Sequence, residues 1–131
     1  MPAAEHTLVI VERAYRGAVE DQFADVLYFV RGLHRQSGDV ELALRGTAAS
    51  YAVQTDRQPA LHIAGRLLDT LSDPRRSVQQ LLDDGVAVWA EEPDLVALGA
   101  TAPARLIPGV RCLAEHELAS RWPNYARVWF F

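Results

Sequence analysis

The sequence predicts one α/β domain of three layers, in which a mostly parallel sheet of about five strands is flanked by helices, as in flavodoxin-like folds. The first observation is the length of 131 residues, enough for one domain with its own core. The second is that short apolar, β-branched runs alternate with segments of helical periodicity, which is typical of parallel strands joined by right-handed crossovers. The third is the lack of any linker or internal repeat, so the domain is expected to span 1–131.

The first half of the chain opens on "HTLVIVE", a compact apolar run of the kind that is buried on both faces of a parallel sheet. A helix is predicted over 17–36, with Val26, Leu27, Val30 and Leu33 at helical spacing. "SGD" ends that helix and a second strand follows. The sequence does not decide the structure of the segment 47–72, which could hold a short helix, an extended stretch and a second short helix.

The second half carries sharper signals. Asp73 and Pro74 suit the N-cap and the first position of a helix that Gly85 ends. "PDLVALG" predicts a short helix, and "HELASRW" predicts a helical turn or two stopped by Pro123. The apolar tail "VWFF" and the "YFV" of the first helix are expected to supply core and a possible subunit interface. The five strands are expected at 6–12, 40–46, 86–90, 109–115 and 125–131.

Composition excludes several classes of protein. A net charge of -4 and a pI near 5.5 argue against a nucleic-acid binder, which normally has a basic surface. All 13 basic residues are arginine, so lysine chemistry is absent. No dinucleotide, P-loop or nucleophile-elbow motif is present, so no cofactor is expected and an enzymatic role is disfavoured. The N-terminus does not resemble a secretory signal and no apolar run has membrane-spanning length, which predicts a cytoplasmic protein without membrane contact.

The carboxyl ends of the predicted strands are where a parallel sheet usually binds ligands. The polar groups there are mixed in charge and suit a small polar or anionic ligand, and "RGTAAS" could offer backbone N–H groups to an anion. The alternative is that Glu92 and Asp94 only cap a helix N-terminus. Too few oxygen ligands converge for a metal site to be expected. The candidate binding residues are Glu12, Arg16, Arg45, Glu91, Glu92 and Asp94, with Arg13, Thr47, Glu115 and His116 at the same edge.

The single cysteine, Cys112, excludes an intrachain disulfide and a cysteine-cage zinc site. It lies in the apolar run "VRCLA", so it is expected to be a core residue on the opposite face of its strand from Arg111. The alternative is an exposed nucleophile or sulfur carrier that uses His116 as its base, with Glu115 nearby. Cys112 and His116 are therefore the candidate catalytic pair.

With its strands placed, the chain resembles the DsrE-like family of small sulfur-relay proteins, which includes the DsrE, DsrF and DsrH and the TusB, TusC and TusD subunits. The opening "TLVIVERAYRG" is similar to the family's first strand, loop and helix. "LLDDGVAVWAEEPDLVALG" resembles the stretch in which a helix, a Gly-Val pair, a strand and a short helix follow in order. "GVRCLAEHELASRWPNYARVWFF" resembles the family's closing strand, short helix and last apolar strand.

The resemblance implies where sulfur chemistry would sit. In catalytic members a persulfide-carrying cysteine follows the strand that corresponds to "VAVWA", at the place of Glu91, sometimes with a second one near Asp94. A carboxylate cannot accept sulfane sulfur. The resemblance therefore implies a diverged member without the usual cysteine: a non-catalytic assembly subunit or a binder of a small polar ligand. It also implies a homo-oligomer, either a trimer or a hexamer. The alternative is a sulfurtransferase or sulfur carrier that uses Cys112.

Overall fold

The computed structural model describes residues 6–14, 26–54, 61–68, 73–100 and 105–131. Its main sheet has five strands in the order β6-β5-β2-β1-β7, and every neighbouring pair is parallel. The predicted strands are thus confirmed in number and direction. Four of them are shorter than expected by one or two residues at one or both ends, and β5 is shifted by one residue. The strands are β1 (Thr7–Val11), β2 (Val40–Leu44), β5 (Ala87–Glu91), β6 (Arg111–Leu113) and β7 (Arg127–Phe130).

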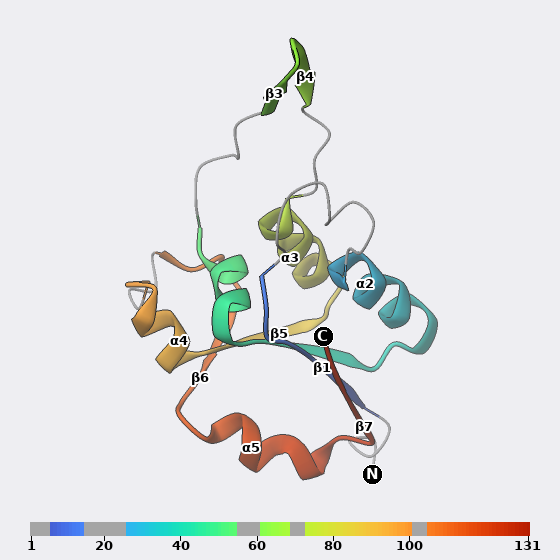
Figure 1. Ribbon diagram of the computed structural model, residues 1–131. Helices are drawn as coiled ribbons and strands as arrows, with labels where there is room; N and C mark the ends of the chain where they lie inside the picture. The colour runs from blue at the N-terminus through green and yellow to red at the C-terminus, as the bar shows by residue number, and fades with distance from the viewer. Residues whose placement is uncertain (1–5, 15–25, 55–60, 69–72, 101–104) are drawn as a thin grey trace.

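Helices cover both faces of this sheet, so the predicted three-layer architecture is confirmed (Figure 1). On one face the larger core packs under α2 (Val26–Ser37) and α3 (Pro74–Asp83), together with the 3-10 helix η2 (Gly46–Ala52) and α4 (Glu92–Ala97). On the other face α5 (Glu117–Arg121), followed by η4 (Trp122–Asn124), passes from β6 at one edge to β7 at the opposite edge. A smaller core lies beneath it.

The capping signals that the sequence gives for α3 are confirmed in detail. The Asp73 carboxylate accepts a hydrogen bond from the Arg75 backbone N–H at 3.1 Å, and Pro74 occupies the first turn with its ring buried. Gly85 follows the helix at a φ of 88°, a conformation that glycine adopts without strain. A salt bridge of 2.6 Å between Arg31 and Asp84 then joins α2 to the end of α3.

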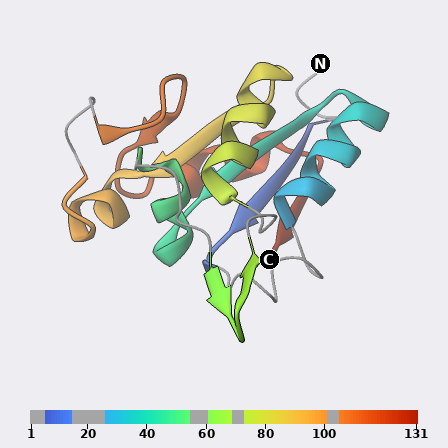
Figure 2. The same cartoon turned by 90° about the horizontal axis from the view of Figure 1, so that it is seen from above.

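The segment 47–72 contains a β-hairpin that the sequence did not predict. β3 (Leu61–Ile63) and β4 (Arg66–Leu68) pair antiparallel around Ala64 and Gly65, both at positive φ, in a two-residue turn. The second short helix considered for this region is therefore wrong over β4, because the turn folds the chain back on itself. The first short helix is present as η2. Figure 2 shows the hairpin extending away from the sheet and its helices.

The aromatic residues assigned to the core are mostly at the surface. In "YFV" only Val30 is buried, whereas Tyr28 and Phe29 are exposed, so the expectation of core positions is wrong for these two residues, and the expectation of a subunit interface stays a prediction. Phe29 instead stacks on Trp129 of β7, with ring centroids 5.9 Å apart, and contacts Phe131 at the same distance. Helical periodicity places Phe29 beside the edge strand β7, where no further layer of the described residues covers it.

Candidate functional site

A pocket of about 320 Å³ opens at the carboxyl edge of the sheet, where β1, β2 and β5 end side by side. This is the edge at which parallel α/β sheets bind ligands, and the volume is that of a small-molecule site. The pocket thus brings together groups separated by some eighty positions in the sequence. Its lining consists of Glu12, Arg13, Arg45, Gly46, Glu91 and Asp94.

Arg45 lies at the centre of the charged groups. Its Nη1 is 3.6 Å from Glu12 Oε1, and its Nε is 3.6 Å from Glu91 Oε2. These distances are those of ion pairs without a direct hydrogen bond, so the guanidinium does not saturate the acceptor capacity of either carboxylate. The arrangement holds the ends of three adjacent strands together and leaves polar atoms available to a ligand.

Asp94 joins the pocket lining to the segment that follows β2. Its Oδ2 accepts a 2.8 Å hydrogen bond from the Gly46 backbone N–H, which lies on the turn after β2. Asp94 and Glu92 do lie in the first turn of α4, where the helix dipole favours them, but the carboxylate of Asp94 binds another segment. The capping interpretation therefore explains the position of Asp94 and not its hydrogen bond. The "RGTAAS" backbone was expected to offer N–H groups to an anion. In the structure its Gly46 N–H binds the Asp94 carboxylate of the same chain.

Glu91 has the perturbed carboxyl group of the site. Only 16% of its side chain is exposed. Burial raises the pKa of Glu91, the Arg45 charge opposes that shift, and a hydrogen bond with Asp94 together with the Asp94 and Glu12 charges adds to it. When Glu91 is protonated it can donate a hydrogen bond to Asp94, and the two carboxyl groups then act as donor and acceptor.

This raised pKa predicts a pH-dependent stability. Glu91 binds its proton more tightly in the folded state, so its contribution falls as pH rises from its ordinary value of 4.5 through the raised pKa. In urea unfolding, the free energy of the wild type minus that of Glu91→Gln is expected to decrease from about pH 4 to about pH 8. Glutamine keeps an N–H donor for Asp94 and removes the titration.

Asp84→Asn is the control, because the pH dependence of its effect on stability should have the opposite sign. The Arg31 hydrogen bond lowers the pKa of Asp84 below its ordinary value of 3.8, so the stabilisation by Asp84 is lost as pH falls. For Asp84→Asn the wild-type-minus-variant difference should therefore rise with pH only up to about pH 5 and stay level above it, so the two series are compared from about pH 3 to about pH 8. If both differences moved in the same direction, the assignment of a raised pKa to Glu91 would be wrong.

Cys112 is exposed, so its interpretation as a core residue is wrong. It lies on β6, the three-residue edge strand, where Leu113 takes the buried position. Arg111, its neighbour, packs over the Trp89 ring at 5.3 Å on the face of α5, in keeping with the predicted alternation of faces. Burial and the nearby Glu92 charge raise the pKa of the Cys112 thiol, which keeps it protonated and a weak nucleophile.

The remaining predicted residues lie apart from the pocket. His116 follows β6 at a φ of 66° and pairs with Glu115 at 3.5 Å, with both side chains almost fully in solvent. Glu92 is exposed and influences Cys112 rather than the pocket. Thr47 accepts a 2.8 Å hydrogen bond from the Ala14 N–H, tying the two turns behind the pocket. Arg16 lies outside the described residues.

Sequence reasoning included Gly46 only as part of "RGTAAS" and missed that it lies against the Glu12 backbone. It has a φ of 56°, and a Cβ atom built there would lie 2.6 Å from the Glu12 carbonyl oxygen. The β1 and β2 turns approach so closely that only glycine fits between them. The signal in the sequence was a glycine directly after a buried strand, which by itself does not reveal the approach of a second turn.

The described residues hold neither a metal-binding cluster nor a membrane-spanning helix. In those ranges no group of three or more His, Cys, Asp or Glu side chains is arranged to hold a metal ion. None of the described helices is long and apolar enough to cross a membrane.

The fold is similar to those of two solved structures. It matches the ychN protein from E. coli with a TM-score of 0.74 and 19% identity, covering 97% of this chain and 99% of that one. It also matches MTH1491 from Methanobacterium thermoautotrophicum, a protein of unknown function, with a TM-score of 0.63 and 15% identity over 94% and 98% of the two chains. Both have the DsrE/TusB-like fold, so the predicted fold class is confirmed. No protein-family model and no curated protein sequence matches this chain.

Proposed function

We propose that this protein binds a small polar ligand in the pocket at the carboxyl edge and does not relay sulfur there. The observation that carries the proposal is the convergence of three carboxyl groups and two guanidinium groups from three strand ends on one cavity of ligand size. Structural needs alone do not require five charged side chains at one point of a small domain.

The groups at the pocket define the ligand class. Glu12 and Asp94 accept hydrogen bonds, Arg13 and Arg45 donate them, and the raised pKa of Glu91 lets that carboxyl group do either. A ligand that carries both an amino or hydroxyl donor and an anionic group complements this set. Glu91 and Asp94 stand where the DsrE-like resemblance puts the sulfur-carrying cysteines, and neither carboxyl group can take up sulfane sulfur. This supports a non-catalytic relative of the sulfur-relay proteins.

Thermal unfolding with small probes tests the proposal. The probes are inorganic phosphate, succinate, spermidine and a set of free amino acids, and at least one is expected to raise the Tm of the wild type. Saturation to about 100 times Kd stabilises by about 2.7 kcal/mol, a shift of several degrees for a domain of this size.

Two variants locate the effect. Arg45→Gln and Glu91→Gln should abolish the Tm shift of the active probe. Glu115→Gln, an exposed carboxylate at the same sheet edge, should keep it, because Glu115 lies outside the pocket lining. A shift that survives both pocket substitutions places the ligand elsewhere and overturns the proposal.

A second candidate function follows from the exposure of Cys112. We propose as the alternative that the Cys112 thiolate attacks the outer sulfur of a persulfide R–S–SH. A bond forms between the Cys112 sulfur and this outer sulfur while the S–S bond of the donor breaks. The donor's proton leaves with the thiol RSH, and the Cys112 persulfide is formed as its anion. This requires an accessible sulfur, which the structure provides, and a thiolate, which the raised pKa disfavours.

Intact mass after incubation with a small-molecule persulfide donor tests this alternative. If Cys112 is a carrier, the wild type gains one sulfur atom and Cys112→Ala gains none. Because Glu92 raises the thiol pKa, Glu92→Gln should also react about 2–5 times faster with a thiol-labelling reagent at neutral pH. Equal labelling rates for the two proteins would show that Glu92 does not act on the thiol.

A further inference from the structure

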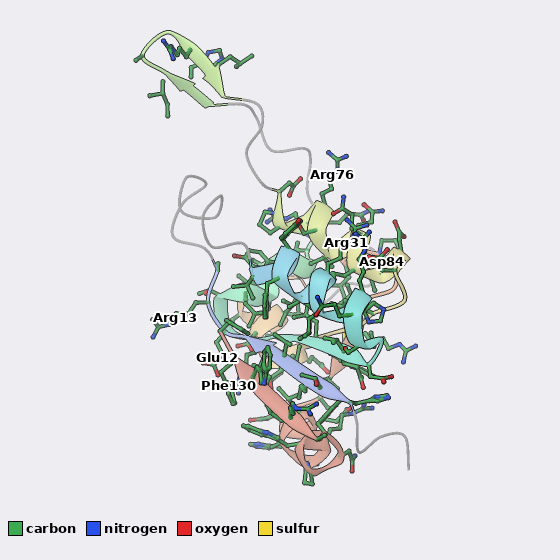
Figure 3. All side chains as sticks on the ribbon, turned by 90° about the vertical axis from the view of Figure 1, so that its right-hand side faces the viewer. Glu12, Arg13, Arg31, Arg76, Asp84 and Phe130 are labelled. Carbon is green, nitrogen blue, oxygen red and sulfur yellow. The ribbon has the colours of Figure 1, made fainter. Side chains whose placement is uncertain are left out.

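The residues that line the pocket differ in exposure, which gives the pocket an inner end and a rim. At the inner end, the Glu91 side chain is 16% exposed and Asp94 is half-buried. At the rim, the Glu12 side chain is 45% exposed and Arg13 is exposed as well. Figure 3 shows Glu12 and Arg13 at the same end of the sheet, with the Arg13 side chain extending outward. A ligand that enters the pocket therefore meets Arg13 first and the Glu91–Asp94 pair last.

Arg13 is the cationic group of the rim that is free to bind an anion. The charge of Arg45 is shared between Glu12 and Glu91, each of which lies 3.6 Å from its guanidinium. Among the described residues, no hydrogen bond, ion pair or ring contact engages the Arg13 side chain. An arginine without a carboxylate partner keeps five N–H donors and a full charge for an anionic group. The rim therefore favours the carboxylate or another anionic end of a ligand.

The inner end has more acceptors than donors. Asp94 uses its Oδ2 for the Gly46 N–H, and no arginine of the described ranges pairs with it. Glu91 has a 3.6 Å contact with Arg45, which is longer than a hydrogen bond. Half-buried carboxyl oxygens are stabilised by further donors. An ammonium group supplies three N–H donors and a positive charge, so it can bond to both carboxyl groups at once.

We propose that the ligand of this pocket is a free amino acid, with its ammonium group between Glu91 and Asp94 and its carboxylate on Arg13. This rests on the proposed function, since it names the ligand class of the same pocket. The charges of the lining agree with it: three carboxylates against two guanidinium groups leave one negative charge for a cation at the inner end. The volume of about 320 Å³ leaves room for a ligand of this size.

The proposed position of the ammonium group predicts that binding releases protons. The charged groups around Glu91 are Arg45 at the end of β2, Asp94 on α4, and Glu12 and Arg13 after β1. Burial raises the pKa of Glu91, Arg45 opposes this shift, and Asp94 and Glu12 add to it. A bound ammonium group stabilises the ionised carboxylate in place of the proton. Binding should therefore release protons near about pH 5 and almost none near about pH 8, where Glu91 is already ionised.

Isothermal titration calorimetry with matched probes tests the proposal. Glycine, β-alanine and γ-aminobutyrate carry both charged groups at different spacings, propylamine carries only the ammonium group, and propionate carries only the carboxylate. At least one of the three amino acids is expected to bind the wild type about tenfold more tightly than either single-charge probe. Titrations in two buffers of different ionisation enthalpy count the protons released.

Three variants assign the two ends of the ligand. Arg13→Gln should weaken binding of the amino acid about tenfold and should not weaken binding of propylamine. Glu91→Gln should weaken both and abolish the proton release, because glutamine carries no proton that titrates. Arg76→Gln is the matched control, since Arg76 is also an exposed arginine and lies on α3 away from Glu12 and Arg13 (Figure 3). It should bind the amino acid as the wild type does.

Two results would overturn the proposal: propionate that binds as tightly as every amino acid, or an amino acid whose affinity survives both pocket substitutions. The proposed function still stands in either case if another probe, such as phosphate or spermidine, raises the Tm and loses this effect in Arg45→Gln. If no probe raises the Tm of the wild type, both proposals are wrong.

Discussion

Gly46→Ala is expected to destabilise the protein by about 3–5 kcal/mol, because one methyl group meets two separate penalties. The first is the φ of 56°, which costs a residue with a Cβ atom about 1–2 kcal/mol. The second is the 2.6 Å approach of that Cβ to the Glu12 carbonyl oxygen, a backbone atom that cannot rotate away. Relief of this clash must separate the β1 and β2 turns and weaken the Gly46–Asp94 hydrogen bond.

Gly38→Ala separates the two penalties. Gly38 has a φ of 78° and open space around a built Cβ, so its substitution should cost only about 1–2 kcal/mol. Urea denaturation of both variants measures the difference. The Gly46 variant should also lose the ligand-induced Tm shift, because Glu12 and Asp94 would move. Equal losses of stability in the two variants would contradict the close approach of the two turns.

Trp89→Ala is the second large effect, with an expected loss of about 3–5 kcal/mol. Trp89 is 8% exposed and forms the centre of the smaller core between the sheet and α5. The Arg121 guanidinium lies 4.2 Å from the centroid of the Trp89 ring, and the Trp89 Nε1–H donates a 2.9 Å hydrogen bond to Glu41. Removal of the ring leaves a cavity and deprives a half-buried carboxylate of a donor.

Two further tryptophan variants give this prediction its controls. Trp89→Phe keeps an aromatic ring in the core and removes the N–H, so its cost of about 1–3 kcal/mol reports the loss at Glu41. Trp122→Ala removes a residue that is 36% exposed and whose ring is tilted against that of Phe130, and should cost about 1 kcal/mol. Chemical denaturation of the three variants should rank them in this order, and a cost for Trp122→Ala equal to that of Trp89→Ala would contradict it.

Local signals predicted most of the sheet. The β-branched run of β1 and the Asp73–Pro74 start of α3 specify their conformations within a few residues, so both are visible without tertiary information. The hairpin was missed because three-residue strands give almost no periodicity and because Ala64–Gly65 is not a strong turn signal. Cys112 was misplaced because sequence does not reveal that β6 lies at the edge of the sheet.

The candidate site was likewise predicted only in part. The rule that ligands bind at strand carboxyl ends selected Glu12, Arg45, Glu91 and Asp94, and these four line one pocket. The same rule selected Glu115 and His116, which follow β6 and lie outside it. The four pocket residues are separated from Glu115 and His116 by their distance along the edge of the sheet. That distance depends on the order of the strands.

The sequence alone predicted the alternation of strands and helices, which follows from interactions between residues near in sequence. The parallel sheet and the edge at which polar groups gather then follow from that alternation, because a helix between two strands makes them parallel. Only the tertiary structure decided which of those groups meet. The order β6-β5-β2-β1-β7 places the ends of β1, β2 and β5 side by side. Contact across neighbouring strands buries Glu91 against Asp94 and Arg45 and admits only glycine at position 46. Burial, pKa and close approach depend on neighbours distant in the chain, and the fold alone brings those together.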